Sequence, residues 1–468
     1  MSPADAQFLK SLFRNLKEES LDSNDDRYFP LYEQEKLFKD DPVTLLQRRI
    51  DWSTGSSVQL LTGFRGTGKT TELLRLRKVL RGDGYTTLLI DMEDYIGLNS
   101  PIEVTDFLLA IACAFGDALY SGDWYDQEKN PNLGDGVWLT ADPAKEGYAA
   151  RFLNYLTRTH VEIPEVTAAV EGGGAKVGLR ATLRSDPSFK QKLQQRMAGH
   201  QATFIADVKQ YIVECVNELR KQHNDPGRQV VLLVDSVEHI RGTTTNVKDV
   251  HASVENLFMQ FNDALELPEL HVVYTVPPFL KALCPGLGSR YSPGGMQLLP
   301  SVNVSKRAGL DVLEQVVGKR GDWEKLLGKR ARLNELLRLS GGHLRDLFRL
   351  LREVVIRADS LPVDRDAING AIDQIRNEFL PIADDDVAWL NRITTTKTSG
   401  LEEGAALPRL AHFLDTHLVL CYRNGHEWYD IHPLIQDFVS DQVKRIVQKS
   451  AKPAPDSAQS DSSDPAED

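Results

Sequence analysis

Eight residues, GFRGTGKT (63–70), constrain the fold of this 468-residue chain more than any other feature of its sequence. They fit the pattern G-x-x-x-x-G-K-[ST], follow the apolar run VQLLTG (58–63) and precede the helical pattern TELLRLRKVL (71–80). Glycines in such a loop let the backbone N–H groups and the helix N-terminus surround an anion closely. The motif therefore predicts a strand–loop–helix unit that binds phosphate groups.

The same pattern gives chemical roles to the two residues that end the loop. Lys69 supplies a point charge to the β- and γ-phosphates of a nucleotide, and the hydroxyl of Thr70 ligates Mg²⁺. We therefore predict that the loop binds ATP or ADP with Mg²⁺. The residues expected to contact the nucleotide are consecutive: Gly63, Phe64, Arg65, Gly66, Thr67, Gly68, Lys69, Thr70 and Thr71.

Short apolar runs alternate with long amphipathic stretches after this loop, which is typical of an α/β fold with a parallel sheet. Besides 58–63, three runs read as strands: TTLLID (86–91), VVLLVD (230–235) and HVVYTV (271–276). Their near-continuous apolar character indicates a sheet that is covered on both faces. A long insertion, at about 121–225, separates the second and third runs, and its glycine-rich middle (168–185) suggests a small hairpin.

The rest of the chain divides by composition and periodicity. We expect an N-terminal helical and extended segment at 1–45 that packs on the following domain, an α/β core at 46–305, a helical region at 306–383, short helices with one hairpin at 384–446, and a disordered acidic tail at 447–468. The hairpin is predicted from HLVLCYRNGHEWYDIH (417–432), in which Asn424-Gly425 is the signature of a type I′ turn. The Pro-, Ser- and Asp-rich composition of the tail predicts disorder.

Acidic residues follow the apolar strand in VVLLVDSVEH (230–239). Asp235 is placed to hold the Mg²⁺ shell, and Glu238 is placed to polarise a water for attack on the γ-phosphate. A competing acidic segment, LLIDMEDY (88–95), contains Asp91, Glu93 and Asp94. It follows the helix of the phosphate loop directly, so we rank it second.

Two further residues are candidates for sensing the γ-phosphate. Thr275 ends the strand-like run 271–276, although a β-branched residue there is as readily structural. Arg345 follows a Gly-Gly turn in RLSGGHLRDLFRLL (338–351) and could reach the phosphates from a helical lid. For an arginine acting on a neighbouring subunit, only Arg241 and Arg290 are weak candidates.

Composition and charge exclude several classes of protein. A net charge of −12 and a pI near 5.5 give no general attraction to nucleic acid or to an anionic membrane. Four widely spaced cysteines in apolar surroundings predict buried, reduced thiols and a cytoplasmic location. The N-terminus has no apolar signal-peptide region, and the most apolar stretch (107–120) is too short to span a bilayer.

The motifs GFRGTGKTTELLRL, VVLLVDSVEH and SGGHLRDL together resemble the AAA+/STAND group of P-loop ATPases over roughly residues 25 to 446. The similarity is to the bacterial branch in which the ATPase core precedes a helical lid and a winged-helix domain. It implies that 306–383 is the lid and that 384–446 is the winged helix.

A further segment, YDIHPLIQDF (429–438), looks like the Met-His-Asp segment of nucleotide-binding immune receptors. That resemblance implies that His432 touches the β-phosphate of ADP and holds a closed state. Ile431 and Pro433 depart from the pattern. A histidine that follows a hairpin is otherwise most often a structural residue.

The resemblance implies a slow, Mg²⁺-dependent ATPase that acts as a nucleotide-driven conformational or oligomerisation switch. Bacterial relatives with this layout commonly serve in antiviral defence or signalling. We find no repeat with a period of 20 to 50 residues and no N-terminal effector segment in this sequence. We therefore expect a homo-oligomer, an effector subunit or a sensor subunit to supply signal input and output.

The alternative is a DNA-associated AAA+ ATPase of the origin-recognition or transposition-regulator type. That function requires a basic hairpin and a basic preceding helix. Residues 401–432 offer only Arg409 and Arg423 against five acidic residues: Glu402, Glu403, Asp415, Glu427 and Asp430. Charge therefore disfavours DNA binding. A metabolic kinase or another phosphotransferase is a third class, for which we identify no acceptor-binding signature.

Overall fold

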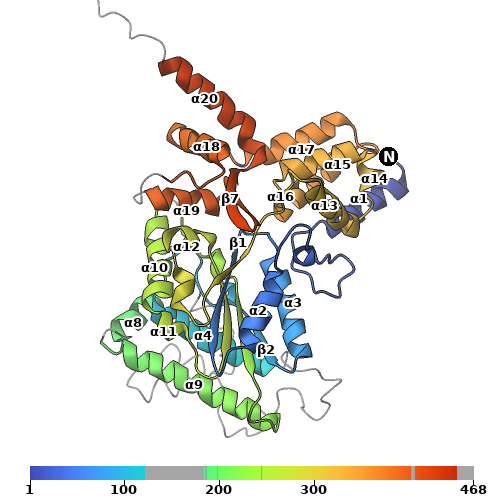
Figure 1. Cartoon of the computed structure of the whole chain (residues 1–468). Coiled ribbons are helices and arrows are strands. Elements are labelled where there is room, and N and C mark those ends of the chain that lie inside the picture. The colour runs from blue at the N-terminus through green and yellow to red at the C-terminus, as the bar shows by residue number, and fades with distance from the viewer. Residues whose placement is uncertain (122–183, 185–186, 198, 244, 402–405, 451–468) are drawn as a thin grey trace, which may run out of the picture.

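The computed structural model describes residues 1–121, 184, 187–197, 199–243, 245–401 and 406–450 (Figure 1). The hairpin predicted in 168–185 lies almost wholly outside these residues, as does the tail from 451 onward. Within the described ranges, no helix combines the length and the hydrophobicity that crossing a membrane requires. The four cysteines are buried free thiols, as predicted.

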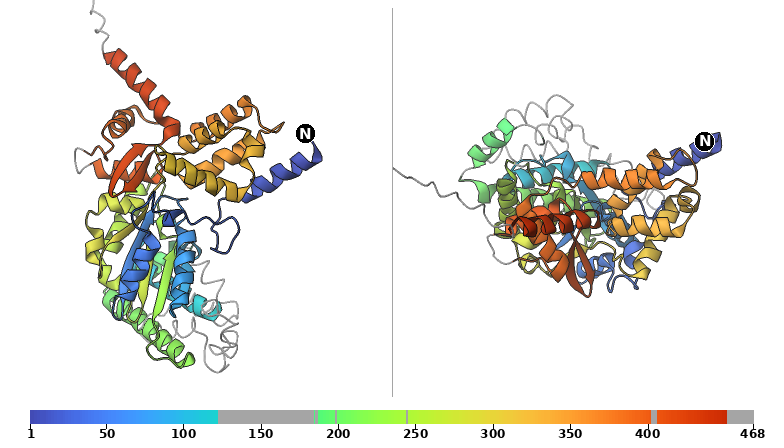
Figure 2. Two further views of the ribbon diagram at one scale, coloured as in Figure 1. Left: turned by 45° about the vertical axis from the view of Figure 1, so that its right-hand side comes forward. Right: turned by 90° about the horizontal axis from the view of Figure 1, so that it is seen from above.

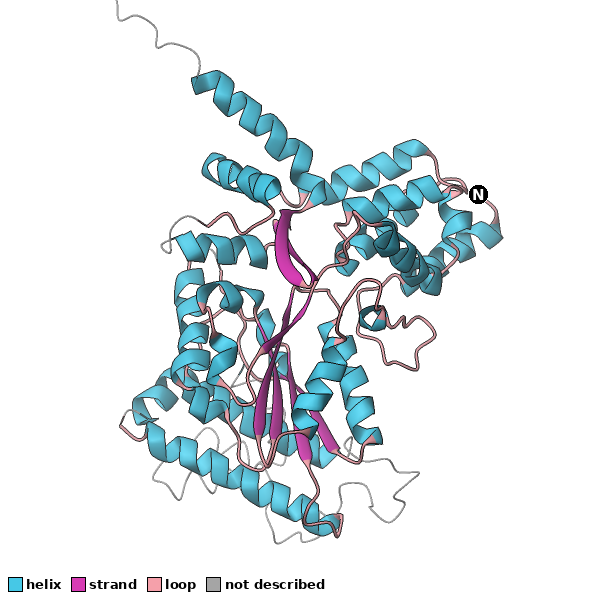
Figure 3. Cartoon of the chain, in the orientation of Figure 1, coloured by secondary structure: helices cyan, strands magenta, loops and turns pink. Residues whose placement is uncertain are grey.

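A parallel five-stranded sheet forms the core, in the order β2-β3-β4-β1-β5 (Figure 3). The strands are β1 (Ser57–Gly63), β2 (Thr86–Asp91), β3 (Val230–Asp235), β4 (His271–Val276) and β5 (Met296–Leu299). The four predicted strands are confirmed. Strand β5 was not predicted from the sequence, because four residues at a sheet edge carry too short an apolar run. Because the strands are parallel, the phosphate loop after β1 and Asp235 at the end of β3 lie at the same carboxyl end of the sheet, with only β4 between their strands.

Helices cover both faces of this sheet, as the apolar strands predict. Along β3, Val230, Leu232 and Val234 belong to one hydrophobic core, whereas Val231 and Leu233 belong to the other. This alternation follows from the two-residue period of a strand. The covering helices include α2 (Pro42–Asp51) and α3 (Lys69–Gly82) on one face, and α4 (Val104–Ser121), α9 (Gln201–Gln222) and α10 (Val247–Gln260) on the other.

Helices alone make up the next region, in agreement with the predicted pattern for 306–383. They are α13 (Arg307–Arg320), α14 (Trp323–Leu327), α15 (Arg330–Leu339), α16 (Leu344–Ile356) and α17 (Arg365–Asn377). Leu347, Leu350, Leu351 and Val354 are buried at helical spacing on α16. Figure 2 shows this helical group beside the carboxyl end of the sheet.

The N-terminal helix α1 (Pro3–Asn15) packs on this helical group rather than on the following α/β core. The expectation that 1–45 packs on the following domain is therefore wrong for α1, which contacts α16. The physical reason is a reciprocal pair of hydrogen bonds: Asn15 Nδ2 donates to the carbonyl of Arg320 at 3.0 Å, and Arg320 Nη1 donates to the carbonyl of Asn15 at 2.9 Å.

In the described residues from 384 to 450, the C-terminal elements are three α-helices, a short 3-10 helix (Pro433–Ile435) and an antiparallel hairpin. The α-helices and strands are α18 (Asp384–Thr396), α19 (Leu407–Asp415), β6 (Val419–Asn424), β7 (His426–Ile431) and α20 (Gln436–Ser450), which projects from the body of the molecule in Figure 1. The hairpin is where the sequence predicts it, but the type I′ turn is wrong. That turn needs positive φ at two residues. Of Asn424 and Gly425, only Gly425 has positive φ, at +101°.

One residue of the phosphate loop belongs to the core of these C-terminal elements. Phe64 is 1% exposed and packs in the same hydrophobic cluster as Phe413, Val419 and Ile431. Its ring meets that of His417 edge-on, with centroids 5.7 Å apart. The side chain of Phe64 thus anchors the loop in the C-terminal elements.

Candidate phosphate-binding site

Backbone conformation explains why glycines occupy the loop between β1 and α3. Gly66 and Gly68 have φ of +92° and +93°, a region that side chains disfavour. A Cβ on Gly66 would also lie 2.3 Å from Cβ of Arg345. The loop conformation and the close approach of α16 therefore both require glycine at position 66.

Lys69 opens α3 and is almost fully buried. Its ammonium group donates to the carbonyls of Gly63 and Phe64 at 2.9 and 2.8 Å. It also forms an ion pair with Glu238, at 3.3 Å from Oε1. The loop thus holds a desolvated positive charge beside the backbone that the motif assigns to phosphate binding.

Asp235 and Glu238 lie where β3 ends, and their environments separate their charge states. Burial, followed by the nearby charge of Glu238, raises the pKa of Asp235 to about 7. Burial also acts to raise the pKa of Glu238, but Lys69 and then His239 outweigh it and hold that pKa below its ordinary value. The ionised carboxylate is therefore Glu238, which fits the role of accepting a hydrogen bond from water.

The donor set at this strand end fits a hydrated Mg²⁺ bound with a nucleotide. The hydroxyl of Thr70 donates a hydrogen bond to Asp235. Oδ1 of Asp235 and Oε2 of Glu238 are buried without a hydrogen-bond partner. Because Mg²⁺ binds oxygen ligands and keeps several waters, one carboxylate and one hydroxyl suffice. Thr70 and Asp235 are the residues that would hold the ion.

Thr275 lies beside this pair but is fully buried. Its hydroxyl donates to the carbonyl of Val234 at 3.3 Å and accepts from the N–H of Val237 at 3.2 Å. Its single proton can bond Glu238 in place of the Val234 carbonyl, and that contact acts to lower the pKa of Glu238. The structure thus brings Thr275 to the candidate base, while contact with a γ-phosphate stays a prediction.

Arg345 reaches the site from α16, as the sequence predicts. A cavity of about 250 Å³ lies between the phosphate loop, η4 (Val237–His239), α16 and the N-terminal segment. Arg345 lines it together with Lys69, Thr70 and Glu238. Three of the nine residues predicted to contact the nucleotide do not line this cavity: Gly63, Phe64 and Thr67.

Among the residues that line this cavity, Glu18 and Arg320 are two that were not predicted from the sequence. Glu18 lies before the first strand, and its Oε2 is 2.5 Å from Nε of Arg345. Arg320 ends α13, and its guanidinium stacks over Phe348 at 4.6 Å. No local motif identifies either residue, since both meet the loop only through the tertiary fold.

The structure does not bring His432 into the cavity. Its side chain is fully buried and stacks on Phe379, with ring centroids 4.5 Å apart. Nδ1 accepts from the N–H of Leu434 at 3.3 Å, so Nε2 carries the proton and faces Oδ2 of Asp346 at 3.4 Å. That separation is long for a hydrogen bond and is mainly an electrostatic contact. Contact of His432 with ADP stays a prediction.

His343, which precedes α16, was also missed. Its Nδ1 lies 2.7 Å from Oδ2 of Asp346, and its Nε2 lies 2.9 Å from the carbonyl oxygen of Arg65. Both partners are acceptors, so the ring needs an N–H on each nitrogen to bond them both. His343, Asp346 and His432 therefore connect the phosphate loop to the end of the hairpin.

The same cluster contains donor atoms that a metal ion could use. Those of His343, Asp346 and His417 lie within 4.8 Å of one another. His343 is directly hydrogen-bonded to Asp346, and Nε2 of His432 carries a proton that faces the same carboxylate. Protons therefore occupy the positions that a bound cation would need. We therefore interpret the cluster as a hydrogen-bonded junction.

The competing acidic segment is linked to the site through one side chain. Asp91 pairs in register with Asp235 at the sheet edge, and Asp94 ends the short helix η2 (Met92–Asp94). Glu93 Oε2 lies 3.1 Å from Nδ1 of His239. This segment therefore supports η4 from the side and does not line the cavity.

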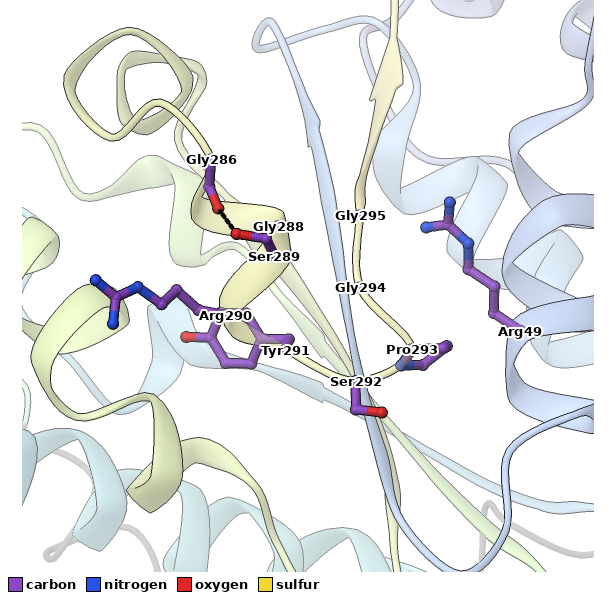
Figure 4. Close-up of a pocket in the computed structure, with 10 residues that line it drawn as sticks. All are labelled: Arg49, Gly286, Gly288, Ser289, Arg290, Tyr291, Ser292, Pro293, Gly294 and Gly295. Carbon is purple, nitrogen blue, oxygen red and sulfur yellow. Dashed lines mark hydrogen bonds between the residues drawn. The ribbon is translucent and has the colours of Figure 1, made fainter.

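The two arginines considered for action on a neighbouring subunit lie in different places. Arg241 lines a small pocket with Arg65 and Glu238, next to its own phosphate loop. Arg290 lies in a second, open pocket with Arg49 and the glycine-rich run 286–295, away from that loop (Figure 4). Neither placement tests a role in another subunit.

The sheet order, the glycine loop after β1 and the acidic end of β3, with β4 between these two strands, together define a P-loop α/β fold. No protein-family model matches the chain, and no curated protein matches it. Solved structures do. The ORC2 protein of Aeropyrum pernix, in its ADPNP–ADP complexes, superposes with a TM-score of 0.40 at 13% identity, covering 93% of this chain and 98% of that chain.

Two further structures are similar. A Walker-type ATPase of Pyrococcus abyssi gives a TM-score of 0.39 at 12% identity over 88% of this chain and 98% of that chain. CDC6P from Pyrobaculum aerophilum gives 0.39 at 11% identity over 95% and 99%. These values are too low to assign a ligand or an activity, so we base the functional proposal on the site itself.

Proposed function

We propose that this protein binds ATP with Mg²⁺, hydrolyses it slowly and uses the nucleotide to change its conformation or assembly. One observation carries the proposal: Lys69, Asp235 and Glu238 converge at the phosphate loop, and Arg345 of α16 closes over Gly66. A positive loop, a metal ligand, a base and a lid arginine are the parts that phosphoryl transfer to water requires.

In this proposal each side chain has one role. Lys69 and the loop N–H groups bind the β- and γ-phosphates, and Arg345 neutralises charge from the lid. Glu238, held ionised by Lys69, accepts a hydrogen bond from the attacking water. Bound Mg²⁺ would neutralise charge on the phosphates. Thr275 acts as a positioning residue for Glu238.

Lys69→Ala tests the proposal. We expect loss of detectable ATP binding in a calorimetric titration, because the loop loses its only ammonium group. The change also leaves Glu238 buried without its partner, so thermal unfolding must accompany the titration. Lys78→Ala on the same helix is the control, since Nζ of Lys78 donates to Oδ1 of Asn24 and Lys78 does not line the cavity. Unchanged affinity in folded Lys69→Ala protein would disprove the proposal.

Glu238→Gln separates binding from hydrolysis. We expect ATP binding to persist and phosphate release to slow by roughly 10²- to 10⁴-fold, the usual contribution of a general base. Single-turnover phosphate release measures this. A turnover rate equal to that of the wild type would assign the base to another residue.

The finer assignment to the AAA+/STAND type comes from the resemblance of the motifs. On that basis we propose that α13–α17 form the lid, that the hairpin segment forms a winged helix, and that partner proteins provide input and output in bacterial antiviral defence or signalling. The junction of His343, Asp346 and His432 supports a switch in which the loop and the hairpin move together.

A DNA-associated ATPase remains the second candidate, and one observation favours it. Three acidic residues counted against DNA binding are not free surface charges. Glu427 pairs with Lys281, Asp430 pairs with Lys397, and Asp415 is half-buried, with its pKa raised to about 6 by desolvation. The ORC1 protein of Aeropyrum pernix was solved in complex with DNA, at a TM-score of 0.32 and 14% identity, which is too distant to support the candidate.

A further inference from the structure

Arg345 has a carboxylate partner within the same chain. Nε of Arg345 lies 2.5 Å from Oε2 of Glu18, and the other oxygen of Glu18 lies 3.8 Å from Nη1 of Arg352. The side chains of Arg345 and Glu18 are 30% and 23% exposed, so the pair is partly shielded from solvent. Both residues line the cavity at the phosphate loop.

The segment that carries Glu18 is fixed on both sides of the cavity. Before Glu18, Asn15 is bonded to Arg320 of the helical group. After it, the N–H of Leu21 donates to the hydroxyl of Thr71 on the phosphate-loop helix at 3.2 Å. Only five residues separate the two anchors, so the position of Glu18 is set by the fold rather than by its own flexibility.

The geometry points to Glu18 as a positioning residue that competes with the γ-phosphate for Arg345, an inference that rests on the proposed function. A guanidinium group binds carboxylate and phosphate oxygens through the same donors. Because Arg345 stands directly over Gly66, a γ-phosphate in the loop comes within its reach. Arg345 must then exchange Glu18 for the phosphate.

Because of this exchange, ATP and ADP have different effects on the N-terminal segment that carries Glu18. ADP lacks the γ-phosphate and leaves the Arg345–Glu18 pair in place. ATP breaks the pair and places the carboxylate of Glu18 beside a polyphosphate, where like charges repel. Release of residues 16–20 from Arg345 is therefore the expected response to ATP and not to ADP.

Glu18→Gln tests the exchange, with ATP and ADP affinities measured by calorimetry on the full chain. We expect ATP affinity to rise relative to ADP affinity by roughly two- to fivefold, which corresponds to the interaction free energy of a partly exposed ion pair. Glu19→Gln is the matched control: Glu19 lines the same cavity but pairs with Arg27 and Lys17. It should leave the ATP-to-ADP ratio at the wild-type value.

A double variant shows whether Glu18 acts through Arg345. In the Arg345→Ala background, Glu18→Gln should no longer change the ATP-to-ADP ratio. Equal effects of Glu18→Gln on both nucleotides, or equal effects of the two glutamine variants, would overturn the inference in favour of general charge repulsion. An unchanged ratio would overturn it as well.

If the proposed function itself is wrong, the binding measurements give a result that differs from failure of the exchange alone. In that case the wild-type chain binds neither nucleotide, and Lys69→Ala changes nothing. Should Glu18→Gln protein fail to fold, Glu18→Asp keeps the charge but shortens the side chain, and the same rise in the ratio is expected. A wild-type ratio in folded Glu18→Asp protein would count against the exchange.

Discussion

Asp235 and Glu238 are three positions apart, yet burial and neighbouring charges give them opposite protonation tendencies. Lys69 lies against Glu238 and keeps it ionised, so the proton that two buried carboxylates share resides on Asp235. A metal ligand must be deprotonated. Binding of Mg²⁺ at Asp235 is therefore coupled to release of a proton.

The affinity for Mg·ATP should consequently depend on pH. The pKa of Asp235 is raised from 3.8 to about 7, so its contribution to folding stability is present below about pH 4 and is lost as pH rises to about 7. The affinity for Mg·ATP should have the opposite pH dependence. It should increase by up to about tenfold per pH unit and level off above pH 7. Calorimetry at pH 6, 7 and 8 measures this.

Asp235→Asn is the control, because ATP itself also titrates in this range. The variant should bind Mg·ATP more weakly and lose the part of the pH dependence that belongs to the protein. A wild-type pH profile in Asp235→Asn protein would contradict the assignment of the proton to Asp235.

Site residues that belong to a contiguous sequence motif could be predicted from the sequence. Lys69, Thr70 and Asp235 belong to short motifs whose geometry is local, so their convergence follows from one strand–loop–helix unit and from β3, which lies in the same parallel sheet. Glu18 and His343 were missed because Arg345, the partner of Glu18, and Arg65, whose carbonyl His343 contacts, lie hundreds of residues away along the chain. Charge complementarity across such distances leaves no local signature.

Among the elements, α16 is the one on which the site depends most. It presents Arg345 to the cavity, packs its apolar face into the helical group, and carries Asp346 beneath His343 and His432. A shift of this helix along its axis changes all three contacts at once. The helix therefore links the phosphate loop to the hairpin.

Asp346→Asn tests this link. The change leaves a buried, doubly bonded His343 without its anionic partner, which we expect to reduce the free energy of unfolding by about 3 kcal/mol. Urea unfolding measures the loss. Asp373→Asn, on the exposed face of α17, is the control and should stay within about 0.5 kcal/mol of the wild type. Equal stability of both variants would show that the junction contributes little.

The elements that sequence reasoning found are those with a complete apolar pattern. The four longer strands and the helices of 306–383 carry enough periodic positions to be recognised. The edge strand β5 does not, and the turn at Gly425 was assigned from a dipeptide whose conformation the flanking register overrides. Propensity at a turn is a weak guide where strand pairing fixes the backbone.

For the whole molecule, the proposed switch predicts a change of assembly or shape with nucleotide. Light scattering of the purified chain with Mg·ADP and then with a nonhydrolysable ATP analogue should give a larger mass, or a different hydrodynamic radius at equal mass, with the analogue. Lys69→Ala protein should not respond. If the mass and the hydrodynamic radius are the same with both nucleotides, the protein binds nucleotide but does not act as the proposed switch.

The same samples decide between the switch and the DNA-associated alternative. At physiological salt we expect only weak binding to duplex DNA, with a dissociation constant no tighter than about 10⁻⁶ M, because net charge is −12. Fluorescence anisotropy with a labelled duplex measures this. Tight binding whose affinity falls steeply with salt would favour the DNA-associated function.

Phe64 shows that the phosphate loop and the C-terminal elements cannot be treated as separate bodies. A large aromatic side chain from one is an interior residue of the other, and truncating such a residue typically costs about 3–5 kcal/mol. Any swing of the C-terminal elements away from the sheet must therefore strip Phe64 of its surroundings or drag the loop along. Undocking of the C-terminal elements and reshaping of the loop are therefore coupled through this ring.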